Sequence, residues 1–216
     1  MKIQILKNII DENDVIAKKI NEKLNEFNIF CMNFMSSPGA GKTEIITQLI
    51  EKYYNKKRIG VIEGDVSTTI DAEKLAKHKI PVIQINTDIF GGGCHLSASL
   101  IEQALEKFDL SKLDILIIEN IGNLICPGEY NLGEHKKIVV ISLTEGVEKP
   151  LKYPLLFRRA DAVLINKVDL EPYLDTKAKD VIKNIRTINS KVQIFSLSAK
   201  TGEGIDNFID WINNEI

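Results

Sequence analysis

The segment that decides the fold is Ser36–Thr43, which reads SSPGAGKT. It follows an apolar run at Ile29–Met35 and opens a helical pattern at Lys42–Tyr54, which is the context that a phosphate-binding loop needs. Glycines in such a loop let backbone N–H groups turn toward phosphate oxygens, and the start of the helix adds positive potential. We therefore interpret this segment as a nucleotide phosphate site.

The residue types in the loop match the parts of that site. Lys42 brings a charge to the β- and γ-phosphates, and the Thr43 hydroxyl is a Mg²⁺ ligand. The first position, commonly glycine in this pattern, is Ser36, but the Gly41-Lys42-Thr43 core is intact. The residues expected to contact the nucleotide here are Pro38, Gly39, Ala40, Gly41, Lys42 and Thr43.

Outward from this loop, short apolar runs alternate with helical patterns. Several runs are apolar throughout, as expected of parallel strands that are covered on both faces. The predicted strands are Ile29–Met35, Arg58–Glu63, Val82–Ile85, Ile115–Glu119, Ile138–Ser142, Ala162–Asn166 and Gln193–Ser196, and the predicted helices are Lys42–Tyr54, Thr69–Lys77, Ser97–Glu106, Thr176–Asn189 and Gly204–Asn214. This alternation predicts an α/β fold with a doubly wound, mainly parallel sheet flanked by helices, the P-loop NTPase fold.

The segment before the first predicted strand has a different character. Residues 1–28 place apolar side chains at helical spacing among charged ones, and we expect an amphipathic helix over Glu12–Glu26 that packs on the core. Residues 29–216 contain no repeat, low-complexity tract or linker, so we expect them to form one domain.

Composition excludes several classes of protein. Of the 216 residues, 44% are hydrophobic and 27% are charged, and the formal net charge is −2. These values are typical of a soluble globular protein, and they favour neither a nucleic-acid nor a membrane partner. The polar N-terminus is unlike a signal peptide, and three cysteines do not build a disulfide scaffold. We therefore expect a cytoplasmic location.

A second motif follows the sixth predicted strand and identifies the base. Asn166-Lys167-Val168-Asp169 ends in a carboxylate that can accept hydrogen bonds from N1–H and the exocyclic amino group of guanine, a pair of donors that adenine lacks. Asn166 and the stem of Lys167 are expected to complete the pocket. Ser198-Ala199-Lys200 follows the last predicted strand, where a backbone N–H can reach guanine O6. These motifs predict GTP rather than ATP, and thus a GTPase domain over residues 29–216.

Carboxylates follow the second and fourth predicted strands. Asp65 lies in the segment EGDVST, and Glu119 opens the segment ENIGN. Both stand at the carboxyl ends of parallel strands, where ligands bind in this class of fold. We expect Asp65 to act on Mg²⁺ and the attacking water and Glu119 to act in the Mg²⁺ shell, with Lys42 as the third catalytic residue. The alternative is that either carboxylate caps a helix or lies in a solvated loop.

Two groups that speed phosphoryl transfer are missing from the pattern. No glutamine follows Gly122, and no arginine finger is evident, so intrinsic hydrolysis is expected to be slow. A second subunit could supply the missing charge, and Lys149 and Lys152 are candidates for that role. Lysines of this kind are more commonly only solvated.

A glycine run leads into the most unusual stretch after the phosphate loop. Cys94 and His95 follow Gly91-Gly92-Gly93, and Cys126 follows the ENIGN segment. Thiolate and imidazole groups select Ni²⁺, Zn²⁺ or Cu rather than Mg²⁺, so these residues form a candidate metal site, with Cys94 of two chains meeting across a two-fold axis. The alternative is that the cysteines are small buried hydrophobes.

The position of Cys126 after the Glu119–Gly122 segment suggests that hydrolysis alters metal affinity. The remaining cysteine and histidines have simpler interpretations. Cys31, inside the first predicted strand, is interpreted as core packing. His78 and His135, each near lysines, are interpreted as surface residues.

Together, these motifs resemble one family, the HypB-type GTPases that incorporate nickel into hydrogenase. The resemblance runs from about Cys31 to the C-terminus and depends most on ENIGNLICP at Glu119–Pro127 and EGVEKPLKYP at Glu145–Pro154. It implies a GTP-dependent metallochaperone that is a homodimer in the GTP state, with Ni²⁺ or Zn²⁺ at Cys94, His95 and Cys126. It also implies two partners, the hydrogenase large subunit and a second nickel accessory protein.

The chain departs from the family pattern in two respects. It lacks the N-terminal cysteine motif and the histidine-rich stretch of some members, so nickel storage there is not expected. Asn131 and Ser97 stand where acidic residues are common in the family. Leu170 and Leu174 form an apolar pair after the guanine motif and are candidate dimer contacts.

Three other functions stay open. A urease-maturation GTPase is the nearest, although that branch uses a Cys-Pro-His metal motif and here Cys94 and His95 are adjacent. A regulatory GTPase with purely structural cysteines is the second. The third, a P-loop kinase of a small substrate, is disfavoured by the guanine motifs.

Overall fold

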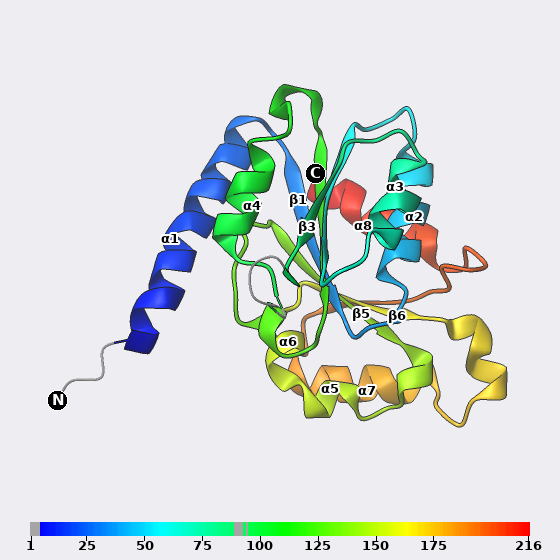
Figure 1. The fold of residues 1–216 in the computed structure, drawn as a ribbon. Coiled ribbons are helices and arrows are strands. Elements are labelled where there is room, and N and C mark those ends of the chain that lie inside the picture. The colour runs from blue at the N-terminus through cyan, green and yellow to red at the C-terminus, as the bar shows by residue number, and fades with distance from the viewer. Residues whose placement is uncertain (1–4, 89–92, 94) are drawn as a thin grey trace.

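Seven parallel strands form the centre of the molecule (Figure 1). The computed structural model describes residues 5–88, 93 and 95–216. The strand order is β3-β2-β4-β1-β5-β6-β7, and every pair in the sheet is parallel. The strands are β1 Phe30–Ser36, β2 Ile59–Asp65, β3 Val82–Asn86, β4 Ile115–Gly122, β5 Lys136–Ser142, β6 Ala162–Asn166 and β7 Gln193–Ser196. The prediction of a doubly wound parallel sheet is confirmed.

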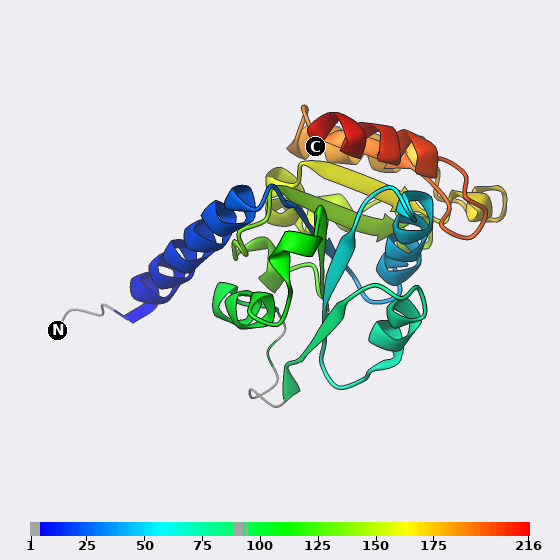
Figure 2. The ribbon, with the colours of Figure 1, turned by 90° about the horizontal axis from the view of Figure 1, so that it is seen from above.

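Helices cover both faces of this sheet. Figure 2 shows α1 and α4 on one side and α2 and α3 on the other. The helices are α1 Ile5–Glu26, α2 Lys42–Tyr53, α3 Ile70–Ala76, α4 Ala98–Leu105, α5 Lys149–Lys152, α6 Pro154–Arg159, α7 Ala178–Ile188 and α8 Ile205–Glu215. Because both faces are covered, all seven residues of β1 are buried, which explains why its sequence shows no polar alternation.

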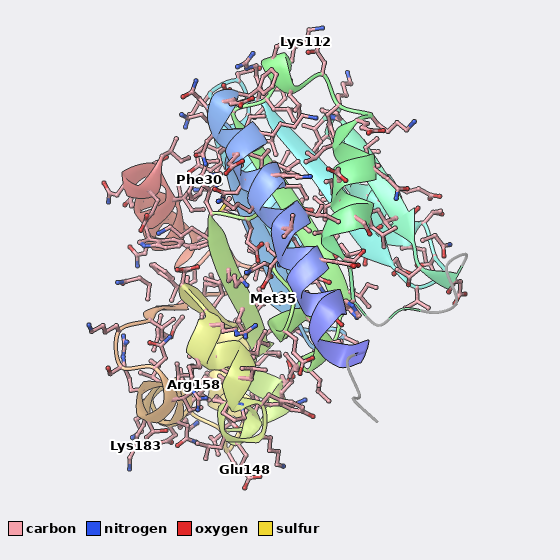
Figure 3. The ribbon with its side chains drawn as sticks, turned by 90° about the vertical axis from the view of Figure 1, so that its left-hand side faces the viewer. Phe30, Met35, Lys112, Glu148, Arg158 and Lys183 are labelled. Atoms are coloured by element: carbon pink, nitrogen blue, oxygen red, sulfur yellow. The ribbon has the colours of Figure 1, made fainter. Side chains whose placement is uncertain are left out.

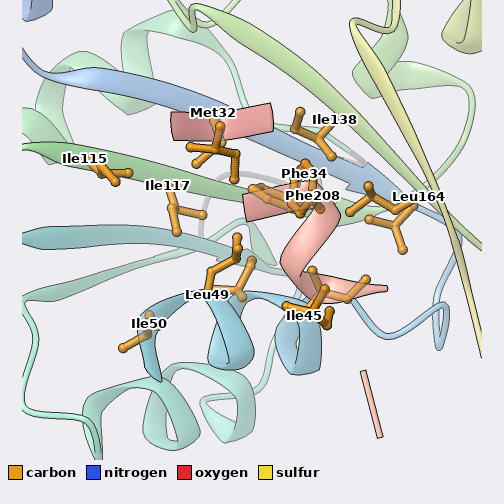
Figure 4. Packing of buried hydrophobic residues seen from close by; sticks show 14 of the residues in the cluster. Met32, Phe34, Ile45, Leu49, Ile50, Ile115, Ile117, Ile138, Leu164 and Phe208 are labelled. Carbon is orange, nitrogen blue, oxygen red and sulfur yellow. The ribbon is translucent and has the colours of Figure 1, made fainter. Parts of the chain in front are cut away.

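Successive side chains of a strand point to opposite faces of the sheet, so they pack into separate hydrophobic cores. On one face, Met32 and Phe34 of β1 pack with α2 and with Phe208 of α8 (Figure 4). On the opposite face, α1 and α4 pack over β4 through residues that include Leu24, Ile101 and Leu116. The two cores hold β1 and β4 side by side in the middle of the sheet, so the loops that follow these strands emerge from a rigid base.

The first helix is longer than its apolar pattern predicts. It begins at Ile5 rather than Glu12, and Figure 3 shows it lying lengthwise in front of β1. Asn13 is buried at its contact with α4, because its Oδ1 accepts the Ala98 N–H at 2.9 Å and its Nδ2 donates to the Asn131 carbonyl at 2.8 Å. Among the described residues, none of the helices is both long enough and apolar enough to cross a lipid bilayer.

Two short helices, α5 and α6, were not predicted. Each has six residues or fewer, and each carries a proline in its first turn. A helix of this length completes too few turns to show an apolar period, and proline in the sequence indicates an interruption rather than a first turn. Their positions depend on packing against α7 and not on local propensity.

The interpretation of His135 as a surface residue was wrong, because its half-buried ring packs between the sheet and the end of α1. His78 is partly exposed, as a surface residue can be. His135 precedes β5 and lies beside β1, where its Nδ1 accepts the Cys31 N–H at 2.9 Å and its ring stacks on Phe30. Its Nε2 lies 3.1 Å from Asn25 Oδ1, near the end of α1. These contacts need a neutral ring with its proton on Nε2. Neighbouring lysines in the sequence gave no sign of this packing.

We expect His135 to make the fold sensitive to acid. Burial lowers the pKa of His135 from its ordinary value of 6.5, and the Glu134 carboxylate only partly opposes this shift. The unfolded chain therefore takes up a proton more readily than the folded one, and stability falls as the pH drops below about 6.5. Urea unfolding of the wild-type protein should show a lower free energy of unfolding at pH 5 than at pH 8.

His135→Gln should flatten this dependence, because glutamine has no ionisable group. At pH 8 it should cost about 1 kcal/mol for the altered hydrogen bond. The matched control is His78→Gln, at a partly exposed histidine outside this contact. It should keep the wild-type pH dependence. Equal slopes for the His135→Gln variant and the wild-type protein would contradict the assignment.

Candidate nucleotide and metal sites

The phosphate loop leaves β1 and turns directly into α2. Gly39 and Gly41 have φ angles of 72° and 95°, a region that L-residues other than glycine rarely occupy. Lys42 is the first residue of α2, and its Nζ donates to Ser36 Oγ at 3.0 Å. Ser36, the one departure from the usual loop pattern, thus holds the lysine. Burial lowers the pKa of Lys42, although the nearby carboxylates, Glu119 first, oppose the shift.

This loop forms one wall of a cleft of about 600 Å³. The opposite wall comes from the carboxyl ends of β2 and β4, which is where open α/β sheets bind ligands. The lining includes the predicted residues Pro38 to Thr43, Asp65, Glu119 and Lys167, and also Glu63, Asp71 and Lys74, which were not predicted. The structure therefore brings the expected phosphate and cation residues to one cavity.

Thr43 and Glu119 meet at the bottom of the cleft. The Thr43 hydroxyl donates to Glu119 Oε1 at 2.7 Å, while Glu119 Oε2 is buried and has no hydrogen-bond partner in the described structure. Burial raises the pKa of Glu119, and Lys42 partly opposes that shift. A hydroxyl and a carboxylate with an unused oxygen are the ligand types that Mg²⁺ takes in nucleotide sites, so these side chains fit the ion.

Asp65 has a different environment from Glu119. Its Oδ1 accepts the backbone N–H groups of Ser67 and Thr68, both at 2.8 Å. These bonds stabilise the turn after β2. One oxygen of Asp65 therefore has the structural role that the sequence analysis gave as the alternative. Asp65 still lines the cleft, and its second oxygen lies outside this pair of bonds.

Glu63 was not recognised as a site residue. It is 2% exposed, and its Oε2 is buried without a hydrogen-bond partner in the described structure. Burial, followed by the like charges of Glu119 and Asp65, raises the pKa of Glu63 to about 8. The segment EGD could have identified it, because carboxylates at the carboxyl end of a parallel strand lie at the edge of the sheet where ligands bind.

The guanine motif is tied to the phosphate loop by Asn166. Its Nδ2 donates to the Ala40 carbonyl at 2.9 Å, and its Oδ1 accepts the Ala199 N–H at 3.0 Å. Asn166 is buried, and its amide joins three loops; its part in the guanine pocket stays a prediction. The N–H of Ala199 is likewise used within the protein.

Lys167 and Asp169 have different surroundings. Lys167 adopts a left-handed conformation, with φ of 65°, and its Nζ donates to the Gly39 carbonyl at 2.8 Å. Asp169 Oδ1 is buried and has no hydrogen-bond partner among the described residues. A buried carboxylate oxygen without a donor is costly unless a ligand supplies one, as the N1–H and amino group of guanine would.

The two candidate metal segments lie side by side. The His95 ring stacks on Tyr130, four residues after Cys126, with ring centroids 4.0 Å apart and an interplanar angle of 14°. Burial lowers the pKa of His95, opposed by Glu129, and a neutral imidazole is the form that binds metals. Cys94 lies outside the described residues, and within the described part of the chain no three His, Cys, Asp or Glu side chains group closely enough to hold a metal ion.

These segments also approach the phosphate cleft. The Leu96 N–H donates to Asn120 Oδ1 at 3.4 Å, so the residue after His95 contacts the residue after Glu119. Leu96 also covers Gly64, where an added Cβ would lie 2.9 Å from Leu96 Cδ1. Gly122, four residues before Cys126, packs on the backbone of Pro38. The His95–Leu96 segment therefore contacts backbone of the nucleotide site, and the Cys126 segment begins from it.

The lysines considered for a neighbouring subunit have partners in their own chain. Lys149 pairs with Glu145 at 3.3 Å, and Lys152 pairs with Glu148 at 2.9 Å. Glu145 also accepts a hydrogen bond from the Ser37 hydroxyl, a link between the phosphate loop and the EGVEKPLKYP segment that was not predicted. Leu174 packs partly on the core beneath β5 and β6.

A strand-to-helix phosphate loop, a buried hydroxyl–carboxylate pair beneath it and a loop tied to it by Asn166 define a P-loop nucleotide-binding protein. Comparison with known proteins agrees. Residues 31–196 match the family model described as "CobW/HypB/UreG, nucleotide-binding domain". The chain belongs to this family, and its relatives place it in the HypB branch.

Three relatives illustrate that placement. The hydrogenase maturation factor HypB of Azotobacter vinelandii is 39% identical over 99% of this chain and 69% of its own length. The probable HypB of Methanocaldococcus jannaschii is also 39% identical, over 99% of this chain and 96% of its own length. The crystal structure of Helicobacter pylori HypB in complex with nickel superposes with a TM-score of 0.88 at 37% identity and covers 94% of both chains.

Proposed function

We propose that the chain is a GTP-hydrolysing metallochaperone that helps to insert nickel into [NiFe] hydrogenase. The observation that carries this proposal is the contact between the His95–Leu96 segment and Asn120, directly after Glu119. This contact joins a candidate metal segment to the strand end that lines the phosphate cleft. The hydrogenase maturation role of a HypB relative and the nickel bound in the Helicobacter pylori HypB crystal structure support the choice of cargo and client.

The proposed reaction is attack of water on the γ-phosphate of GTP, which releases GDP and phosphate. Asp169 and Lys167 would bind the guanine, while the N–H groups of Gly39 to Thr43 and the Lys42 ammonium would bind the phosphates. Mg²⁺ bound by Thr43, Glu119 and Asp65 would neutralise charge on the phosphates. We expect a slow intrinsic rate, because the pairing of Lys149 and Lys152 within the chain offers no charge to the reacting phosphate.

The proposed cargo site uses Cys94, His95 and Cys126, with Ni²⁺ or Zn²⁺ as the ion. Thiolate and imidazole ligands suit both metals. The stacking of His95 on Tyr130 brings the loops of two of these residues together. Because the Cys126 loop begins at backbone of the phosphate cleft and the His95 loop contacts it, loss of the γ-phosphate would move them and change metal affinity.

The proposed active form is a homodimer in the GTP state, with residues 1–28 as a helix packed on a GTPase domain of residues 29–216. Leu170 and Leu174 remain the proposed dimer contacts, with Tyr173 between them 84% exposed. The proposed partners are the hydrogenase large subunit and a second nickel accessory protein. A reducing cytoplasm would keep the cysteines available as thiolates.

Metal titration in two nucleotide states tests this proposal. Equilibrium Ni²⁺ and Zn²⁺ binding should differ between the GDP and GTP-analogue states, with molar mass measured in parallel to detect the dimer. His95→Ala and Cys126→Ser should each weaken metal binding by about ten-fold or more. His78→Ala, a half-buried histidine lining a separate cavity, is the matched control. If His95→Ala and Cys126→Ser bind metal like the wild-type protein, the cysteines are structural and a regulatory GTPase is the better conclusion.

A further inference from the structure

Glu63 and Glu119 occupy paired positions on neighbouring strands. The register of β2 with β4 places the Glu63 Cα directly beside the Glu119 Cα. Both residues line the phosphate cleft, and both are nearly inaccessible, at 2% and 3% exposure. Two buried carboxyl groups at adjacent positions repel each other when both are ionised, so the native fold keeps an arrangement that is unfavourable without a ligand.

The unused oxygens of this pair point to the kind of ligand that relieves it. Glu119 Oε1 is occupied by the Thr43 hydroxyl, but Oε2 of Glu119 and Oε2 of Glu63 are buried and lack hydrogen-bond partners in the described structure. Buried acceptors are nearly always satisfied in folded proteins. Two unsatisfied carboxylate oxygens beside one hydroxyl form a set that suits a hard divalent cation with its bound water.

The charge balance of the cleft leads to the same ligand. Its lining residues carry five carboxylates and three lysines: Glu44, Glu63, Asp65, Asp71 and Glu119 against Lys42, Lys74 and Lys167. A nucleotide would add several more negative charges from its phosphates. Strong binding of that anion next to an excess of carboxylates requires cations to neutralise the charge.

We propose that Glu63 is a further residue of the divalent-cation site, acting with Glu119 to hold the cation, directly or through one cation-bound water. This inference rests on the proposed function, because it assigns a role within the same GTP site. Asp65, by contrast, commits one oxygen to the N–H groups of Ser67 and Thr68. Glu63 therefore supplies a carboxylate oxygen that the protein does not use for its own loops.

The test separates cation binding from nucleotide binding. Affinity for a fluorescent GDP is measured over a Mg²⁺ titration and in EDTA, for the wild-type protein, Glu63→Gln, Glu119→Gln and the control Glu73→Gln. Glu63→Gln should raise the Mg²⁺ concentration for half-maximal binding by about ten-fold or more. In EDTA its affinity for GDP should equal or exceed that of the wild-type protein, because Glu63 acts on the nucleotide only through the cation.

The control removes a carboxylate of the neighbouring helix α3 that does not line the cleft. Glu73 is exposed and accepts a hydrogen bond from the Thr69 hydroxyl at 2.7 Å, so Glu73→Gln should shift the Mg²⁺ requirement by no more than about two-fold. Electron paramagnetic resonance of Mn²⁺ with bound GDP gives a second readout, in which Glu63→Gln should show weaker Mn²⁺ binding. A role limited to folding would move neither measurement.

The outcomes distinguish this inference from the proposed function. An unchanged Mg²⁺ requirement in Glu63→Gln, with a raised one in Glu119→Gln, overturns the role of Glu63 and leaves the GTPase intact. Failure of the wild-type protein to bind guanine nucleotides overturns the proposed function itself. Should Glu63→Gln not fold, Glu63→Asp keeps the charge and shortens the side chain, and an unchanged Mg²⁺ requirement in that variant also overturns the proposal.

Discussion

Asp169→Asn is expected to lower the affinity for GDP by about a hundred-fold or more and to create affinity for xanthosine diphosphate. Asp169 Oδ1 is buried without a hydrogen-bond partner in the described structure, so a base that offers two donors satisfies it. Asparagine replaces one acceptor by a donor and would face the guanine amino group with its own N–H₂. Xanthine carries a carbonyl at that position, which accepts from the asparagine.

Competition between the two diphosphates for a fluorescent GDP measures this change. Asp175→Asn is the matched control, because Asp175 is an exposed carboxylate six residues further along the chain, and it should leave both affinities unchanged. A variant at Asp169 that binds GDP as tightly as the wild-type protein, or that gains nothing for xanthosine diphosphate, would show that another group reads the base.

Gly41→Ala is expected to abolish measurable nucleotide binding and to destabilise the fold. Gly41 has a φ of 95°, and an added Cβ would overlap with Nδ2 of Asn166. The Asn166 side chain cannot move away cheaply, because Ala40 and Ala199 hold both ends of its amide. Backbone strain and the overlap together should cost about 2–5 kcal/mol.

Thermal unfolding and GDP binding of this variant are compared with those of Gly146→Ala. Gly146 also has a positive φ, of 89°, but an added Cβ there would meet no atom within 4 Å. That control should lose about 1–2 kcal/mol from backbone strain alone and keep its nucleotide affinity. If Gly41→Ala behaves like Gly146→Ala, Asn166 does not restrict the phosphate loop.

Local patterns were sufficient for most of the fold. The bounds of β6 and β7 match the predicted segments residue for residue, and α2 differs only at its last residue. Each of these elements carries a strong apolar run or period bounded by turn residues. The helix α1 extended beyond its predicted start, and α5 and α6 were missed, because packing against neighbouring elements decides such segments more than propensity does.

The residues of the candidate site likewise fall into those that local sequence predicted and those that only tertiary contacts place. Lys42, Thr43 and Asp169 could be predicted because each belongs to a short motif whose backbone shape is local. The structural role of Asn166 and the hydrogen bond from Lys42 to Ser36 could not be predicted. Their partners come from other loops or from a turn whose geometry the sequence does not specify. His135 was misjudged for a similar reason, since Cys31 and Phe30 lie over a hundred positions away.

The sequence by itself determined the alternation of strands and helices, the phosphate loop and the membership of the chain in its family, because these depend on residue types at short, regular spacings. Only the tertiary structure decided that Glu63 stands beside Glu119 and that the His95 ring stacks on Tyr130, in the segment after Cys126. Such relations follow from strand register and from burial, which bring together residues that no local spacing connects.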